Sequence, residues 1–178
     1  MINGHEYVDL GLSVKWATCN VGASSPTEYG NYYAWGETST KKEYSEKNSR
    51  THGKDIVNIG GNPSYDAARA NWGCSWRLPT LAEFYELIDN CKIKWTTQDG
   101  IKGRMFTSKK NGKSIFLSAA GWRYGSSLYS AGEYGNYWCS TPTESSTDSA
   151  YALDFNSGRC SSHWSVRNFG QSVRPVSE

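Results

Sequence analysis

The segment Cys160-Ser161-Ser162-His163-Trp164 places a thiol and two hydroxyls close to an imidazole, which are the groups of a nucleophile and its base. Neighbours in sequence on a strand or loop seldom face one substrate, so we interpret this segment as a surface loop. The chain contains no GxSxG, GxGxxG, phosphate-loop or HExxH motif, and its three histidines lie far apart. We therefore expect no catalytic activity and no cofactor.

Metal and disulfide chemistry have little support in the sequence. Five cysteines occur without a CxxC motif or a Cys/His cluster, which argues against structural zinc. Their odd number leaves at least one thiol outside any intrachain disulfide. Cys139 and Cys160 are a candidate pair, and for most of the five we expect a buried free thiol. Asp148 and Asp154 flank a strand-like segment, but two carboxylates without further oxygen ligands are a weak calcium signal.

Length and charge limit the classes of protein. The chain has 178 residues, which fits one domain over residues 1–178. A formal charge of +2 from 19 basic and 17 acidic residues argues against a nucleic-acid partner. No apolar run approaches the roughly 18 residues of a membrane-spanning segment, and residues 1–10 lack the features of a signal peptide. We expect a soluble protein.

Residues 121–174 have an unusual composition. Ser, Tyr, Gly and Asn occupy 12, 5, 6 and 3 of these 54 positions, and lysine is absent. Tyr and Trp give rigid contact area, Ser, Gly and Asn give adaptable hydrogen bonds, and lysine is depleted at interfaces, so the composition is typical of a binding surface. A Gly-rich β domain with many turns has a similar composition, and both interpretations stay open at this point.

Local patterns predict the elements that would position these residues. Alternation around Gly11 predicts a bent strand or short hairpin over residues 7–18, and an Ala-rich stretch predicts a short helix over 64–73. Thr80 precedes Glu83 by three residues, a capping box that begins an amphipathic helix of about three turns. We expect strands at 104–107, 114–119, 136–140, 151–155 and 172–176, and a surface loop at 38–54. Helices in the middle with β structure on both sides define an α+β class.

The predicted strands divide residues 121–176 into core and surface. Apolar residues are expected in the core, namely Trp122, Tyr137, Trp138, Tyr151, Leu153, Phe155 and Val173. Contact residues are expected in the intervening segments 123–130, 143–148 and 159–168, which a compact β scaffold would bring onto one face. Arg174, beside the last strand, is expected to form structural hydrogen bonds or an ion pair.

Several blocks in fixed order resemble the Fibrobacter succinogenes major paralogous domain family, which is abundant in gut bacteria of the Bacteroides type. They are VDLGLSVKWATCNVG (8–22), YAWGE (33–37), DAA (66–68) with WG (72–73), WRLPT (76–80), YW (137–138) with STP (140–142), and SVRPV (172–176). The resemblance covers nearly the whole chain. These domains are similar to members of the C-type lectin fold superfamily, which includes the variable proteins of diversity-generating retroelements and the formylglycine-generating enzymes.

The resemblance implies a C-type lectin fold, in which two helices and small antiparallel sheets support a loop-rich C-terminal binding face. In the retroelement branch, adenine-directed mutagenesis rewrites the 3′ end of the gene. Residues 159–163 fall within the set that AAC and AAT codons reach, and so does Cys139, where the family pattern has serine. Trp164, Glu133, Glu144 and Gln171 fall outside that set, and Gln171 also departs from the aromatic residue expected there.

Two other branches fit the sequence less well. Calcium-dependent sugar binding in true C-type lectins requires Glu-Pro-Asn or Gln-Pro-Asp followed by Trp-Asn-Asp, and the chain contains none of these. A formylglycine-generating enzyme needs a dedicated cysteine pair, for which Cys139 and Cys160 are the nearby candidates, and the chain is short for that family. A metal held between these two thiols would favour a catalytic protein.

We therefore predict a non-enzymatic ligand-binding protein, a diversity-generating retroelement variable protein with a scaffold over 1–120 and a variable, ligand-binding region over 121–176. The alternative is an invariant surface adhesin, or a glycan- or protein-binding module, of the same fold. The partner would be a protein or glycan on a cell or phage-host surface, and the location extracellular, at the cell surface or on a phage particle. The predicted contact residues are Arg123, Tyr124, Ser126, Ser127, Tyr129, Asn136, Cys139, Thr143, Ser145, Asp148, Arg159, Ser161, Ser162, His163, Trp164, Arg167 and Asn168.

Overall fold

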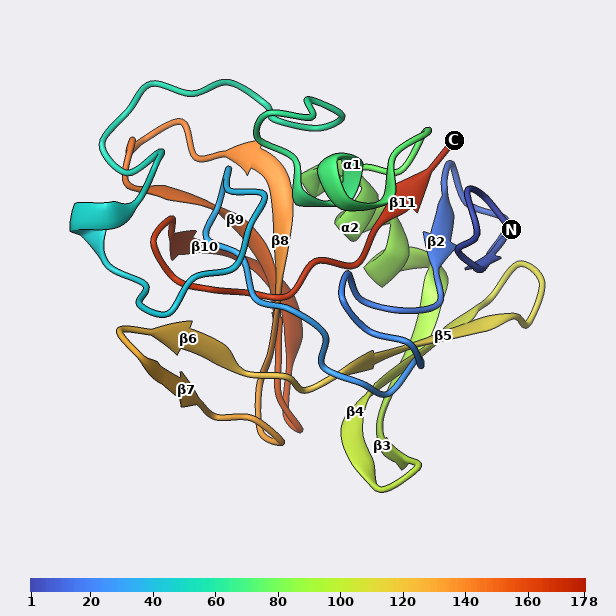
Figure 1. The fold of residues 1–178 in the computed structure, drawn as a ribbon. Helices are drawn as coiled ribbons and strands as arrows, with labels where there is room; N and C mark the ends of the chain where they lie inside the picture. Colours follow the sequence, from blue (N-terminus) through green and yellow to red (C-terminus); the bar gives the residue numbers. More distant parts are fainter.

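The central sheet of the molecule has the strand order β10–β9–β8 and is antiparallel (Figure 1). It consists of β8 (Gly135–Pro142), β9 (Ser149–Phe155) and β10 (Cys160–Val166). The computed structural model describes residues 1–178, and the chain is a mixed fold with more strand than helix, in which two helices accompany four small antiparallel sheets.

Three smaller sheets and the helices surround the central sheet. The sheets are β3 (Cys91–Gln98), β4 (Ile101–Ser108) and β5 (Ser114–Ser118); β1 (Tyr7–Val8), β2 (Lys15–Ala17) and β11 (Val176–Ser177); and the hairpin of β6 (Trp122–Tyr124) and β7 (Ser127–Tyr129). The helices are α1 (Ala67–Trp72) and α2 (Leu81–Asn90), and Glu46–Asn48 forms one 3-10 turn. No helix is long and apolar enough to span a bilayer.

Each face of the central sheet packs against its own buried cluster. On one face, Tyr137 and Leu153 join Phe84 and Leu87 of α2 in cluster 1. On the other face, Trp138 joins a group that includes tryptophans from three other segments, cluster 2. Aromatic side chains therefore provide much of the buried area, which compensates for the low content of aliphatic residues.

Both helices follow their sequence signals. The Thr80 hydroxyl accepts a hydrogen bond from Glu83 N, and the Glu83 carboxylate accepts one from Thr80 N, so the predicted capping box is confirmed. The buried Asp66 carboxylate caps α1 by accepting from Arg69 N and also accepts from Leu78 N, which ties the start of α1 to the segment before α2. For residues 7–18 the sequence left open a bent strand or a short hairpin, and the structure shows the hairpin.

Arg174 is fully buried, as its expected structural role requires. Its Nε donates to Asn20 Oδ1 at 2.9 Å and its Nη1 to the Ala17 carbonyl at 3.3 Å. Burial lowers the pKa of this guanidinium, because the charged form loses hydration. Arg174 thus links the C-terminal segment to residues 17–20.

Several strands differ from the prediction. The prediction omitted β3, β6, β7 and β10, and of the expected strand at 172–176 only residue 176 lies in β11. The surface loop over residues 38–54 is largely irregular, but it buries Tyr44 and Thr51. The Tyr44 hydroxyl donates to the Tyr32 carbonyl at 2.6 Å, which anchors this polar segment to the scaffold.

Candidate recognition surface

The hairpin β6–β7, the β8–β9 loop, and the end of β10 with the segment that follows it lie on the side of the molecule away from the two termini (Figure 1). The start of β10, at Arg159 and Cys160, lies at the other end of the central sheet, because Cys160 pairs with Phe155 and Val166 with Ser149. Arg123 and Gly170 exchange two backbone hydrogen bonds of 2.8 and 2.9 Å, which join the hairpin to the chain beyond β10. Arg167 N donates to the Asp148 carbonyl at 2.9 Å, which joins that chain to the β8–β9 loop.

The hairpin β6–β7 presents an exposed aromatic face. Trp122 pairs with Tyr129 and Tyr124 with Ser127 across the two strands, so these four side chains lie on the same side. Tyr124 and Tyr129 keep 50% and 44% of their surface exposed. The Trp122 and Tyr129 rings stack with centroids 6.1 Å apart, and the Tyr124 ring meets Phe169 edge-on at 5.4 Å. We call Trp122, Tyr124, Tyr129 and Phe169 the aromatic face.

The opposite side of the hairpin attaches it to the scaffold. The Arg123 guanidinium lies 5.1 Å from the centre of the buried Tyr32 ring, and Gly125 exchanges two backbone hydrogen bonds of 2.8 Å with Tyr44. Gly125 has φ of +58° at the first central position of the two-residue turn, a position that favours glycine in hairpins. The hairpin is therefore held from behind while its aromatic face stays open.

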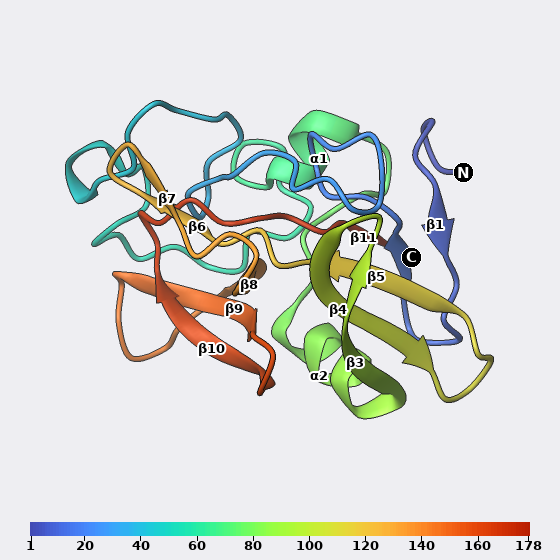
Figure 2. The same cartoon turned by 90° about the horizontal axis from the view of Figure 1, so that it is seen from below.

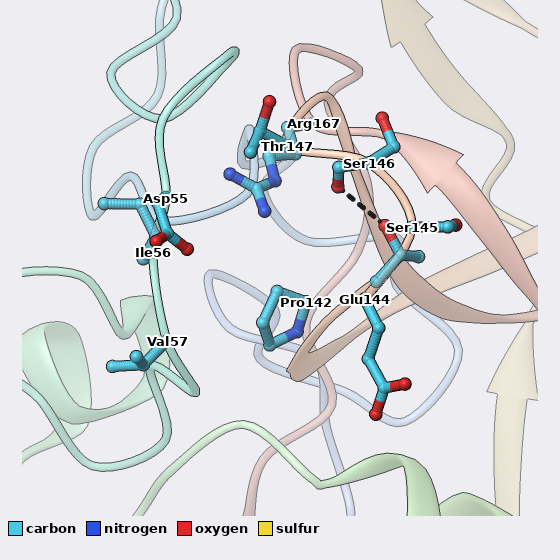
Figure 3. Close-up of a pocket in the computed structure, with 10 residues that line it drawn as sticks. Asp55, Ile56, Val57, Pro142, Glu144, Ser145, Ser146, Thr147 and Arg167 are labelled. Carbon is cyan, nitrogen blue, oxygen red and sulfur yellow. Dashed lines mark hydrogen bonds between the residues drawn. The ribbon is translucent and has the colours of Figure 1, made fainter.

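The β8–β9 loop forms one wall of a polar pocket of about 580 Å³. Residues 55–57 form the other wall, and the Arg167 guanidinium lies between the two (Figure 3). Thr143 shapes the loop, because its hydroxyl donates to the Ser146 carbonyl at 2.9 Å. Residues 55–57 were not among the predicted contact residues, although Ile56 and Val57 are an unusual apolar pair inside a polar stretch.

Arg167 holds the back of this pocket together. Its Nε donates to the Ser149 carbonyl at 3.0 Å, and its Nη1 donates to the Thr51 and Lys54 carbonyls at 3.0 and 2.7 Å. The guanidinium also lies 4.5 Å from the centre of the Trp35 ring. Burial lowers the pKa of Arg167, and carboxylates nearby partly oppose that effect. The side chain is buried and not exposed as we expected, and its hydrogen bonds serve the scaffold.

Strand β10 exposes side chains on both sides of the sheet. Ser162 and Trp164 pair with Leu153 and Tyr151 and therefore lie on the cluster 1 side, whereas Ser161 and His163 lie on the cluster 2 side. Trp164 is 57% exposed. The segment is a strand and not the loop we expected, and its alternate residues cannot all contact one ligand.

The structure separates the predicted contact residues into exposed and buried groups. Those with exposed or half-exposed side chains are Arg123, Tyr124, Ser126, Ser127, Tyr129, Ser145, Asp148, Arg159, Ser161, Ser162, His163 and Trp164. Those that are buried, and so wrongly placed on the surface, are Asn136, Cys139, Thr143, Arg167 and Asn168. Asn136 and Cys139 are buried because β8 has clusters on both of its faces. Leu128, which we did not predict, is 37% exposed on the hairpin.

The five thiols are all free. Cys160 is level with Gly135 across the sheet, and Cys139 lies four residues further along β8. Two strand spacings and four residues separate the two Cα atoms by about 16 Å, far beyond the roughly 7 Å that a disulfide spans. Neither the proposed disulfide nor a metal shared by these two thiols fits this register. No group of three or more His, Cys, Asp or Glu side chains is arranged to hold a metal.

The comparisons with known proteins give a family but no activity. A family model described as "Domain of unknown function (DUF8237)" matches residues 88–176, which is half of the chain. The chain therefore belongs to this family. The matched residues include β3 to β10 and so contain the whole central sheet and the hairpin. No curated protein and no solved structure matches the chain.

Thiol reactivity tests the assignment of these cysteines to the interior. Burial raises the pKa of Cys160 to about 11 and that of Cys139 well above its ordinary value. At pH 8 only about one Cys160 thiol in a thousand is ionised, and each unit by which the pH rises towards 11 increases that fraction about tenfold. We expect iodoacetamide at pH 8 to label the exposed Cys74 at least tenfold faster than Cys160, and Cys139 only after unfolding.

Mass spectrometry of the alkylated peptides measures these rates. Labelling of Cys139 in the folded protein at the rate of Cys74 would contradict the buried position of β8.

Proposed function

We propose that this chain is a non-enzymatic ligand-binding protein of C-type lectin fold that contacts its ligand mainly through the aromatic face of the hairpin β6–β7. The observation that supports this most is the exposure of Tyr124 and Tyr129 side by side on a ribbon whose other side is fastened to the scaffold. Half-exposed aromatic rings held in fixed positions lose little entropy on binding, and aromatic residues dominate the energetics of interfaces.

The surroundings of the aromatic face supply polar contacts. Ser126 and Ser127 lie at the tip of the hairpin and are exposed. Asp148 and Ser145, from the β8–β9 loop, are exposed at the same end of the molecule. No lysine occurs beyond residue 113, so neither the hairpin nor the β8–β9 loop contains this side chain, which is costly to immobilise and depleted at interfaces.

The C-type lectin assignment is supported by the location of the blocks that resemble the Fibrobacter succinogenes major paralogous domain. Trp35, Trp76, Trp138 and Arg174 belong to those blocks and are all fully buried. The resemblance implies a scaffold that buries such residues and presents its variable region at one end. A location outside the cell, at a cell surface or on a phage particle, belongs to the same proposal.

Diversification by a retroelement deepens this proposal, and the structure indicates where variation is tolerable. Substitutions at exposed Ser126 and Ser127 change the surface alone, whereas substitutions at Cys139 change a buried strand. A diversified gene would therefore vary at exposed positions and spare most of β8. Variation at Cys139 would be tolerated only where the new residue is serine or another small residue that does not overfill the core.

Sequencing the gene's locus and its 3′ end across many cells of one community tests the diversification. We expect a nearby near-identical repeat that differs from the gene only at adenines, with the affected codons at exposed positions of residues 121–176. An invariant 3′ end without a repeat or a reverse transcriptase gene contradicts diversification. The protein is then the alternative, an invariant adhesin or binding module that uses the same aromatic face for a fixed protein or glycan.

Binding measurements test the face itself. We expect the labelled protein to bind members of arrays of glycans and of bacterial surface proteins. The double variant Y124S/Y129S should weaken that binding at least tenfold, because it removes both exposed rings from the contact.

Tyr85→Ser is the matched control, since Tyr85 is 48% exposed on α2, outside the aromatic face. Binding that survives in Y124S/Y129S but is lost in Tyr85→Ser contradicts the proposed surface.

A further inference from the structure

Strand β10 forms the margin of the central sheet, and its outer side is unpaired. No strand or isolated bridge of the chain pairs with it beyond β9 (Figure 2). A free strand edge is a template for another strand, and folded proteins usually protect such edges with Lys, Pro or a bulge. The sequence from Cys160 to Val166 contains neither residue, and its register with β9 runs without interruption.

The hydrogen-bond pattern shows which backbone groups are free. Asn156 N donates to the Arg159 carbonyl at 3.0 Å, and Arg167 N donates to the Asp148 carbonyl at 2.9 Å. Arg159 and Arg167 therefore face β9, and so does every second residue between them. The residues that direct their N–H and C=O groups outward are Cys160, Ser162, Trp164 and Val166.

Two of these outward carbonyls accept hydrogen bonds from groups outside β9, as expected for carbonyls that point away from that strand. The Val166 carbonyl accepts from Phe169 N at 3.1 Å. The Trp164 carbonyl accepts from His163 Nδ1 at 2.7 Å, so the imidazole covers part of the edge. The backbone groups of Cys160 and Ser162 have no such cover.

We propose that two copies of this chain associate by pairing their β10 strands antiparallel, about a twofold axis at Ser162. This axis places Ser162 opposite itself and Cys160 of one copy opposite Trp164 of the other. Cys160, Ser162 and Trp164 all lie on the cluster 1 side of the sheet. The 57% exposed Trp164 ring then packs beside the half-buried Cys160 of the other copy.

A second copy fits this edge because the strand is complementary to itself. Cys160 and Trp164 are spaced equally on either side of Ser162 and share one face with it, while Val166 lies beyond this symmetric pair. The strand contains no Asp, Glu, Lys or Arg, so no like charges meet across the axis. Isologous contacts of this kind close as a dimer. The proposal does not depend on the ligand-binding function, and the dimer would present two aromatic faces.

A charge exchange at the axis tests this pairing. Ser162→Lys and Ser162→Asp each place like charges opposite one another in a homodimer, and we expect each to weaken dimerisation at least tenfold. An equal mixture of the two variants should recover a heterodimer, since only the mixture places opposite charges across the axis. Analytical ultracentrifugation of the full chain measures the association, and circular dichroism checks the fold.

A second variant acts without adding charge. His163→Ala removes the imidazole that donates to the Trp164 carbonyl. Because this carbonyl is then free to accept from the second copy, we expect dimerisation to become about threefold tighter. The control is Ser127→Lys with Ser127→Asp on β7, a second strand with an unpaired edge, where we expect no effect. A wild-type protein that stays monomeric up to millimolar concentration overturns the proposal. The proposal is also overturned if the dimer dissociation constant is unchanged by the Ser162 variants, is changed by the Ser127 variants, or is raised by His163→Ala.

Discussion

The burial of β8 on both faces is the constraint on which the rest of the structure depends. Tyr137 points into cluster 1 with the helix α2, and its neighbour Trp138 points into cluster 2. The Trp138 indole donates to the Tyr33 carbonyl at 2.7 Å, and the Tyr137 hydroxyl donates to the Ser118 carbonyl at 2.7 Å. Strand β8 thus joins the two clusters, and its hydrogen bonds hold the segments around Tyr33 and Ser118. The elements that carry the exposed side chains are positioned against this strand and its two clusters.

Elements outside the two clusters are attached mainly by hydrogen bonds and not by buried apolar contacts. The hairpin β6–β7 is attached to the scaffold through backbone hydrogen bonds and the Arg123 side chain. Tyr124 and Tyr129 contact the partly buried rings of Phe169 and Trp122 and belong to neither cluster. Arg167 joins residues 51–54 to β9 by donating to backbone carbonyls and not to a carboxylate. A rigid interior can therefore support a surface whose composition varies.

The sequence predicted the helices best, because their signals are local. Thr80 and Glu83 specify the start of α2 without reference to any distant residue. Strand β10 was missed because both of its sides are partly exposed at the sheet margin, so it lacks the alternation of a half-buried strand. Asn136, Arg167 and Asn168 were misplaced because polar residue types favour the surface, and their burial depends on packing that only the assembled sheets create.

The most direct test of this account is the free energy of unfolding of Y124S/Y129S in urea, compared with that of Tyr137→Ala. The account predicts that the double variant loses no more than about 2 kcal/mol, the worth of two aromatic contacts. Tyr137→Ala should lose about 3–5 kcal/mol, because it opens a cavity beside β8. A double variant as destabilised as Tyr137→Ala would mean that the aromatic face belongs to the core, and would contradict the proposed recognition surface.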